Sequence, residues 1–325
     1  MPHNLFEGRM AFVGEVPWHG LGTAVPSSVT AAEMIDAAGL AWKVTVRPAP
    51  GARLVNEKRD IYDRYLVARA NAGEEQAVLG LVGSRYVPLQ NAEAFSFFEP
   101  FIRNAWATFH TAGALGNGER VWVLAKLSGQ IIVGTDDKID RFLLLSNTHN
   151  GSGAVTIRFT PIRVVCQNTL NWAEKGGTSV ISVRHTKNIG ENLKKAQAQE
   201  LKAIVDKVFA EAEILFGAMA ARKLDVENID EFLELLFPRT EKQKKADQEP
   251  ERWARIRAVL DDRRVTPPQT RNTLWGVYNA IVRAEDYRVS RQSGPARLER
   301  VWFGSGHDLK TKALAAARDW LGRAA

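Results

Sequence analysis

The only cysteine of the chain, Cys166, stands in the stretch TPIRVVCQNTLN beside two side-chain amides, Gln167 and Asn168. A catalytic cysteine needs a base such as histidine and a lowered thiol pKa. The six histidines stand singly along the chain, at His3, His19, His110, His149, His185 and His307. Cys166 instead follows Val164 and Val165 in a strand-like run, and free cysteine is among the most buried residue types. We therefore expect Cys166 to pack in a core, and we assign no catalytic residue.

Two further segments have residue types that bind metals or phosphates. Asp136 and Asp137, in VGTDDKID, have carboxylates that could hold Mg²⁺, but an aspartate pair between two strands is more typical of a hairpin turn. The glycine-rich GALGNGER lacks the Lys-Ser/Thr of a phosphate-binding loop and precedes a strand instead of a helix. We interpret both as hairpin loops and expect no cofactor.

Basic and amide side chains gather between Gly151 and Gly190, where Glu174 is the only acidic residue. The candidate nucleic-acid contacts are Arg158, Arg163, Gln167, Asn168, Arg184, His185, Lys187 and Asn188, together with Arg85 and Tyr86 from GSRYVPL. Such groups donate hydrogen bonds to phosphate oxygens. Because Arg158 and Thr160 lie two apart, the polar groups of that strand can share a face, and a basic sheet face can follow a nucleic-acid backbone. The alternative is a solvated strand end that only carries charge.

Aromatic side chains in loops bounded by glycine or proline could stack on unpaired bases. They are Trp18 beside His19 in PWHGLG, Tyr86 in GSRYVPL, and Trp302 and Phe303 in RVWFGSG. Taken singly, each is more typically packed against its own domain.

The composition is that of an ordinary globular protein, with 45% hydrophobic and 25% charged residues among 325. The formal net charge of +7 and the pI of about 9.5 favour anionic partners, although a mild excess of charge also serves solubility. A single cysteine excludes an internal disulfide and a multi-thiolate zinc site. The chain has no apolar run of about 18 residues and no signal-peptide pattern, so we expect a cytoplasmic protein without a membrane partner.

The hydrophobic pattern divides the chain in two. Residues 1–190 carry short runs rich in Val, Ile, Leu and aromatics between turn residues, which predicts a β-rich domain with a basic strand face. Two helices are expected inside it, over TAAEMIDAAG with Thr30 as N-cap and over NAEAFSFFEPFIRNA with Asn91 as N-cap. Residues 191–325 have helical spacing, beginning with a long amphipathic helix near residues 192–221, and contain a polar, exposed connection near residues 239–252. The fold class is α+β, a β-rich sheet domain packed with helices and followed by a mainly α-helical region.

Several longer motifs run through both halves of the chain. They are PWHGLG, GSRYVPLQNAEAF, SNTHNGSGAVTIRFTPIRVVCQNTLN, SVRHTKN, TLWGVYNAIVRAEDY and RLERVWFGSGHDLKTKAL. In these motifs, over nearly its whole length, the chain resembles the uncharacterised phage/plasmid-like protein family, a domain of unknown function found in phages, plasmids and bacteria. The resemblance implies a role in the replication, recombination or defence of mobile elements. It carries over no catalytic residue.

These observations favour a non-enzymatic nucleic-acid-binding protein of mobile elements, which binds or anneals single-stranded DNA in phage or plasmid recombination. Like phage single-strand annealing proteins, it is expected to act as a homo-oligomer, because a groove continued across subunits can hold many nucleotides. The first alternative is a metal-dependent nuclease or hydrolase that uses Asp136, Asp137, His149 or His185. The second is a counter-defence factor that binds a host protein through its helical half. The sequence leaves open whether the nucleic acid is DNA or RNA.

Overall fold

The computed structural model describes residues 5–14, 21–50, 53–56, 59–62, 64–71, 74–163, 168–169, 181–191, 198–287 and 297–322. The strands are β1 (Leu5–Val13), β2 (Thr23–Val25), β3 (Lys43–Pro48), β4 (Arg53–Asn56), β5 (Arg59–Tyr62), β6 (Tyr65–Asn71), β7 (Glu74–Val82), β8 (Ala107–Leu115), β9 (Arg120–Val133), β10 (Asp137–Thr148), β11 (Val155–Arg163), β12 (Asn168–Thr169) and β13 (Ile181–Val183). The helices are α1 (Ala31–Ala37), α2 (Asn91–Ser96), α3 (Glu99–Arg103), α5 (Ala198–Ala221), α6 (Val226–Leu236), α7 (Glu241–Lys245), α8 (Glu251–Asp261), α9 (Pro268–Arg271), α10 (Leu274–Asp286), α11 (Arg297–Trp302) and α12 (Ser305–Gly322).

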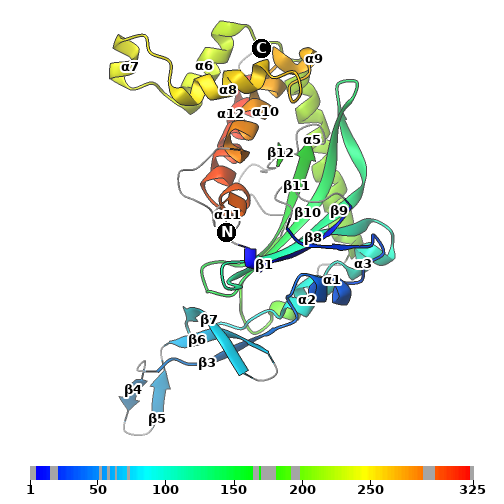
Figure 1. The fold of residues 1–325 in the computed structure, drawn as a ribbon, viewed down its shortest axis with the longest axis vertical. Coiled ribbons are helices and arrows are strands. Elements are labelled where there is room, and N and C mark those ends of the chain that lie inside the picture. Colours follow the sequence, from blue (N-terminus) through cyan, green and yellow to red (C-terminus); the bar gives the residue numbers. More distant parts are fainter. Residues whose placement is uncertain are drawn as a thin grey trace.

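One large sheet runs through the middle of the molecule, with strand order β12-β11-β10-β9-β8-β1-β2 and with β13 also pairing with β11 (Figure 1). Strands β8 to β11 are consecutive antiparallel neighbours. The segments GALGNGER and VGTDDKID supply the β8–β9 and β9–β10 turns, as the sequence predicts. Helices dominate the chain from α5 onward, so the α+β class is confirmed.

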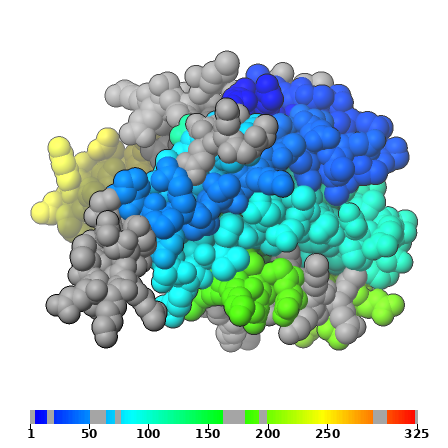
Figure 2. Space-filling view, turned by 90° about the horizontal axis from the view of Figure 1, so that it is seen from below, coloured from blue at the N-terminus to red at the C-terminus, as the bar shows by residue number. Residues whose placement is uncertain are grey.

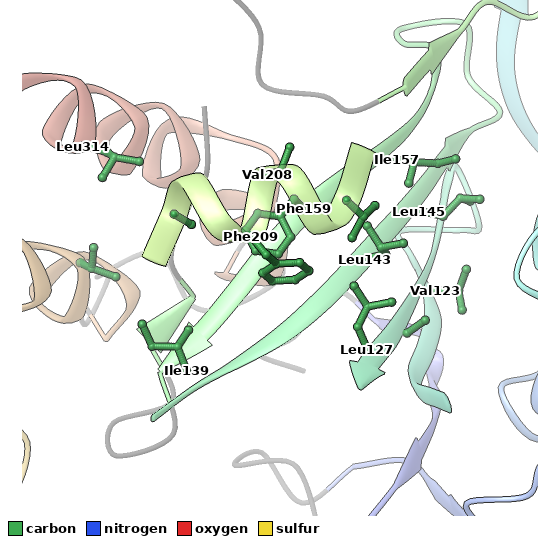
Figure 3. Close-up of a cluster of buried hydrophobic side chains, with 14 of the residues drawn as sticks. Val123, Leu127, Ile139, Leu143, Leu145, Ile157, Phe159, Val208, Phe209 and Leu314 are labelled. Carbon is green, nitrogen blue, oxygen red and sulfur yellow. The ribbon is translucent and has the colours of Figure 1, made fainter. Parts of the chain in front are cut away.

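Helix α5 covers one face of this sheet (Figure 3). The register places Leu143 opposite Phe159 and Leu145 opposite Ile157, and all four side chains are buried. Phe209 of α5 meets Phe159 edge-on at a centroid distance of 3.9 Å. Burying each such side chain contributes about 1.5–3 kcal/mol, so the alternation of apolar residues along β10 and β11 fixes which face receives the helix.

A smaller apolar cluster lies on the opposite face of the same sheet. It consists of Leu5, Met10, Phe12, Leu115, Trp122, Leu124, Phe142 and Leu144, against which Leu21, Trp302 and Phe303 pack. The segment between α11 and α12 therefore lies against this second face. Both faces of the sheet are covered by helical segments from the C-terminal half.

The helical half joins the sheet in one hydrophobic core. Trp275 of α10 is fully buried, and α10 contacts α5, α8 and α12. The fully buried Lys310 of α12 pairs with Asp286 at the end of α10, at 2.9 Å. Helix α7, in the polar connection near residues 239–252, has no buried residue. Among the described helices, none combines the length and apolarity that a membrane crossing requires.

Of the two helices predicted in the β-rich half, the first agrees with the structure and the second agrees only in part. Thr30 caps α1 through a capping box with Glu33, and Gly39 follows with a φ of +71°, as the sequence predicts. The second helix is divided into α2 and α3, and Gln90 instead of Asn91 is its N-cap. Pro100 lies in the first turn of α3, where a residue without a backbone N–H is tolerated. Inside a continuous helix the same proline would remove a backbone hydrogen bond, so the helix is divided at this point.

A small antiparallel sheet, β3-β6-β7, lies at one end of the molecule, and the hairpin β4-β5 extends from it (Figure 1). Gly80 of β7 lies against the loop that follows β10, where a Cβ on Gly80 would be 2.5 Å from Cα of Asn150. The side-chain amide of Gln90 bonds the N–H and the C=O of Val44 at 2.9 and 3.0 Å, which satisfies these edge groups of β3.

Candidate nucleic-acid interface

Two loops that are nearly one hundred residues apart in the sequence lie side by side through Tyr86 and His185. Their rings stack at a centroid distance of 4.7 Å with an interplanar angle of 24°. The backbone N–H of Val87 donates to the carbonyl oxygen of His185 at 3.2 Å, and Nδ1 of His185 donates to the carbonyl oxygen of Val87, also at 3.2 Å. These contacts fix the position of one loop relative to the other.

The segment that follows Tyr86 is also fixed to the end of β10. The hydroxyl of Tyr86 donates to the carbonyl oxygen of Thr148 at 3.3 Å, and Nδ2 of Asn147 donates to that of Leu89 at 2.9 Å. His149 is fully buried, and its Nε2 donates to Oδ1 of Asn91 at 3.1 Å. These three bonds join residues 86–91 to residues 147–149, so the loop that carries Arg85 rests on the main sheet.

Positive charge collects on the outer side of these two loops. Arg85, Arg184, Lys187 and Asn188 are exposed, and each lies within three residues of the contact between Val87 and His185. Figure 2 shows the green surface of residues 181–191 beside the cyan surface of the segment that follows β7. We call these four residues the basic loop surface. Three cations and an amide in adjacent loops suit contact with phosphate oxygens.

The stacked rings of Tyr86 and His185 hold the two loops in position and carry no charge. Burial raises the pKa of Tyr86, and burial lowers the pKa of His185, although the bond to Val87 opposes that decrease. Both side chains are therefore neutral near pH 7. Because each ring stacks on the other, Tyr86 packs within the protein. This agrees with the expectation that an aromatic residue in such a loop typically packs against its own domain.

Arg158 lies apart from the basic loop surface, against the segment between α11 and α12. Its Nη1 is 3.4 Å from the carbonyl oxygen of Trp302 and 3.4 Å from Nε2 of His307. Burial lowers the pKa of Arg158, with a further decrease from Arg120. A half-buried guanidinium that bonds the protein's own helices is a poor phosphate ligand, so Arg158 serves the packing of the sheet.

The register of β11 bears on the basic strand face that the sequence predicts, which stays a prediction. The pairing of β10 with β11 runs without a register shift from Thr156 to Arg163, so residues alternate strictly between the two faces. Arg158 and Arg163 differ by five positions and therefore lie on opposite faces. The backbone of Arg163 pairs with Asn168 of β12. Gln167, as well as Cys166, lies outside the described residues.

The other loop aromatics named from the sequence also pack or lie outside the description. Trp302 meets Trp122 edge-on at a centroid distance of 5.1 Å. The guanidinium of Arg120 lies 4.4 Å from the ring centroid of Phe303. These contacts attach the α11–α12 segment to the second sheet face. Trp18 and His19 lie outside the described residues.

The alternative of a metal-dependent nuclease or hydrolase that uses Asp136, Asp137, His149 or His185 stays a prediction, and the structure gives each of these four side chains a partner within the protein. Asp137 is buried, and its Oδ2 accepts a hydrogen bond from the indole Nε1 of Trp275 at 2.8 Å. Asp136 accepts from Gln269. Asp137 begins β10 and His149 follows its end, roughly 35 Å away for a strand of this length. Within the ranges that the structure describes, no group of three or more His, Cys, Asp or Glu is arranged to hold a metal ion.

The sequence indicates the exposed cations but does not identify the groups that position them. Asn91, Asn147 and Thr148 are not among the residues predicted for the site, although they fix residues 86–91 to the sheet. Their signal is the sudden change from the apolar run of β10 to the polar Ser-Asn-Thr-His at its end. A polar cluster at the end of a buried strand must find partners, because buried polar groups are nearly always hydrogen-bonded.

The fold and the site define an α+β protein whose exposed basic loops are supported by a central, mainly antiparallel sheet. A family model described as Domain of unknown function (DUF932) matches residues 78–302, and the chain belongs to that family. The matched residues include the basic loop surface and most of the large sheet. No curated protein matches the chain, and no solved structure matches it.

Proposed function

We propose that this protein binds nucleic acid through the basic loop surface, as a non-enzymatic DNA-binding protein. The observation that carries the proposal is the contact between Val87 and His185, which brings Arg85 together with Arg184 and Lys187. The net charge of +7 agrees with an anionic partner. Since the nearby rings are occupied by each other, binding is to the phosphate backbone and is independent of base sequence.

The biological setting is part of the same proposal. The protein acts in the cytoplasm on single-stranded DNA, and binds or anneals it during recombination of phages or plasmids. A surface with three cations contacts only a few phosphates, so a homo-oligomer that repeats this surface along the strand would supply the remaining affinity.

The test is fluorescence anisotropy with a labelled single strand of about 20 nucleotides and with its duplex, at about 50 and about 200 mM salt. The variant Arg85→Gln/Arg184→Gln/Lys187→Gln removes the three cations. The matched control Lys207→Gln/Lys242→Gln/Lys245→Gln removes the same charge from α5 and α7, where these lysines are exposed.

Each single-strand phosphate contact contributes about −0.7 to the slope of log affinity against log salt. The variant's slope should therefore be less steep by about 2, while the control keeps the wild-type slope. If the wild type binds neither strand form, or if variant and control bind equally, the basic loop surface is not a nucleic-acid site.

A further inference from the structure

The small sheet β3-β6-β7 has an inner face that packs against the body of the protein. Gly80 of β7 lies against Asn150, and Val67, which pairs with Gly80 from β6, is fully buried. Val46 of β3 pairs with Val67 in the same row. Because side chains alternate between the two faces of a strand, the neighbouring residues of β3 and β6 belong to the opposite, outer face.

The outer face of the small sheet has two adjacent rows of residues that cross all three strands. In each row every residue is in direct register with the next, and the rows are Arg47, Leu66 and Leu81, and then Thr45, Ala68 and Val78. Leu81 is 53% exposed and Val78 is 51% exposed. The outer face therefore presents aliphatic side chains to the surrounding water.

Positive charge borders these aliphatic side chains on the β3 side. Arg47 and Lys43 are exposed, and the alternation along β3 places both on the outer face. No acidic side chain stands among the described residues of the two rows. An apolar surface with cations along one side suits a ligand that has both flat rings and negative charges. Single-stranded nucleic acid is such a ligand, because its bases are unpaired and its backbone carries phosphates.

The outer face lies beside the basic loop surface. Leu81 precedes Arg85 by four residues, which span at most about 13 Å of extended chain. Figure 2 shows the surface of the small sheet, in blue to cyan, on the same side of the molecule as the green surface of residues 181–191. A strand whose phosphates are held by Arg85, Arg184 and Lys187 can therefore continue over the outer face without passing around the molecule.

A second copy of the chain is the rival occupant, since exposed apolar surfaces also mark protein interfaces. A two-fold pairing of this surface with itself would place Arg47 and Lys43 of both copies in one interface. The described residues of the two rows supply no acidic partner for them, and burying unpaired cations is costly. The charge of the outer face thus favours a nucleic acid.

We propose that the outer face of the small sheet contacts the unpaired bases of a strand held on the basic loop surface, and that this contact selects single strands over duplexes. The inference rests on the proposed function and names the form of nucleic acid that the site takes. A duplex presents its phosphates outward and keeps its bases paired inside, so it meets the basic loop surface alone. Aliphatic side chains donate and accept no hydrogen bonds, so the selection is independent of base sequence.

The experiment measures fluorescence anisotropy of the full-length protein with three labelled probes of about 20 nucleotides. They are a single strand, its duplex, and a strand with the same phosphates but with stable abasic sites in place of its bases. The variant is Val78→Ser/Leu81→Ser, and Val78→Thr/Leu81→Thr is a second form that keeps the β-branched side chains favoured in strands. The matched control Ile214→Ser/Val226→Ser changes two exposed aliphatic side chains on α5 and α6. Thermal melts check folding, and light scattering reports the assembly state.

The variant should bind the ordinary single strand about tenfold more weakly than the wild type, because two aliphatic side chains no longer become buried on binding. Its salt slope should be unchanged, since apolar contacts release no counterions. Variant and wild type should bind the duplex equally, and they should also bind the abasic strand equally. The control should bind all three probes as the wild type does.

Equal binding of the ordinary single strand by wild type and variant overturns the inference. An equal loss on the abasic strand also overturns it, because the bases would then not be the contact. A change of assembly state in the variant would show that the outer face binds a second copy of the chain instead. In each of these outcomes the wild type still binds nucleic acid, so the inference fails alone. If the wild type binds neither strand form, the proposed function fails and this inference fails with it.

Discussion

The indole Nε1 of Trp275 donates a hydrogen bond of 2.8 Å to Oδ2 of Asp137, two residues separated by 138 positions. Asp137 begins β10 at the β9–β10 turn, and Trp275 lies in the first turn of α10. Both residues are buried. The bond therefore connects the end of the sheet to the helical half, and it gives a structural role to a carboxylate that the sequence alone suggests as a metal ligand.

Replacing Asp137 with alanine should lower the free energy of unfolding by about 1–3 kcal/mol, because the buried indole N–H loses this acceptor. Asp137→Asn is the matched control, since its amide oxygen can still accept from Trp275. Urea unfolding of both variants measures the difference. Equal losses in the two variants would show that the hydrogen bond is not the source of the stability.

The stability of the protein should fall as the pH falls below about 6.5, because His149 is buried in a neutral form. Burial lowers its pKa to about 3, and burial also lowers the pKa of His110 and of His307 to about 4. Since the folded pKa lies below the unfolded value, the unfolded chain binds protons that the native state does not bind. The contribution of these histidines to the free energy of unfolding is therefore fully present above about pH 6.5 and decreases as the pH falls below it.

At pH 5, His149 alone should cost about 2 kcal/mol relative to pH 7. The variant His149→Gln should therefore show a shallower decrease of unfolding free energy between pH 7 and pH 5, measured by urea unfolding at each pH. A pH dependence identical to that of the wild type would mean that His149 is protonated in the folded state.

Two of the four arginines predicted as phosphate contacts, Arg184 and Arg158, should behave differently when changed to glutamine. Arg184 is exposed, so Arg184→Gln should reduce the salt slope by about 0.7 and weaken single-strand binding about fivefold near 0.1 M salt. Arg158 bonds Trp302 and His307, so Arg158→Gln should keep the affinity and lower the urea midpoint. Anisotropy and urea titrations on both variants check this, and a loss of affinity in Arg158→Gln would contradict the assignment.

Gly80 should not tolerate a methyl group, because its Cβ would lie 2.5 Å from Cα of Asn150 and 2.7 Å from the Asn150 carbonyl oxygen. These are backbone atoms, so the loop after β10 must move, and Gly80→Ala should cost about 1–3 kcal/mol of stability. Gly83 is the matched control, since its Cβ would meet nothing within 4 Å. Similar melting temperatures for the two alanine variants would contradict this packing.

Much of the fold follows from local sequence patterns. The capping box of Thr30 and Glu33, the two hairpin turns of the large sheet and the helical spacing beyond α5 each depend on residues within one or two turns of one another. The division of the second helix was not predicted, although Pro100 is the local signal for it. Such features are encoded by short-range sterics and hydrogen bonding, which a sequence shows directly.

The candidate site was only partly predictable for a related reason. The sequence determined that exposed cations accompany Tyr86 and His185, because residue type and loop composition are local properties. Only the tertiary structure decided that these loops meet, that Arg158 lies beneath Trp302, and that Asp137 bonds Trp275. Each of these contacts joins residues 98 to 144 positions apart. Strand register and helix packing determine which residues meet in these contacts. Both depend on the whole core and not on any single segment.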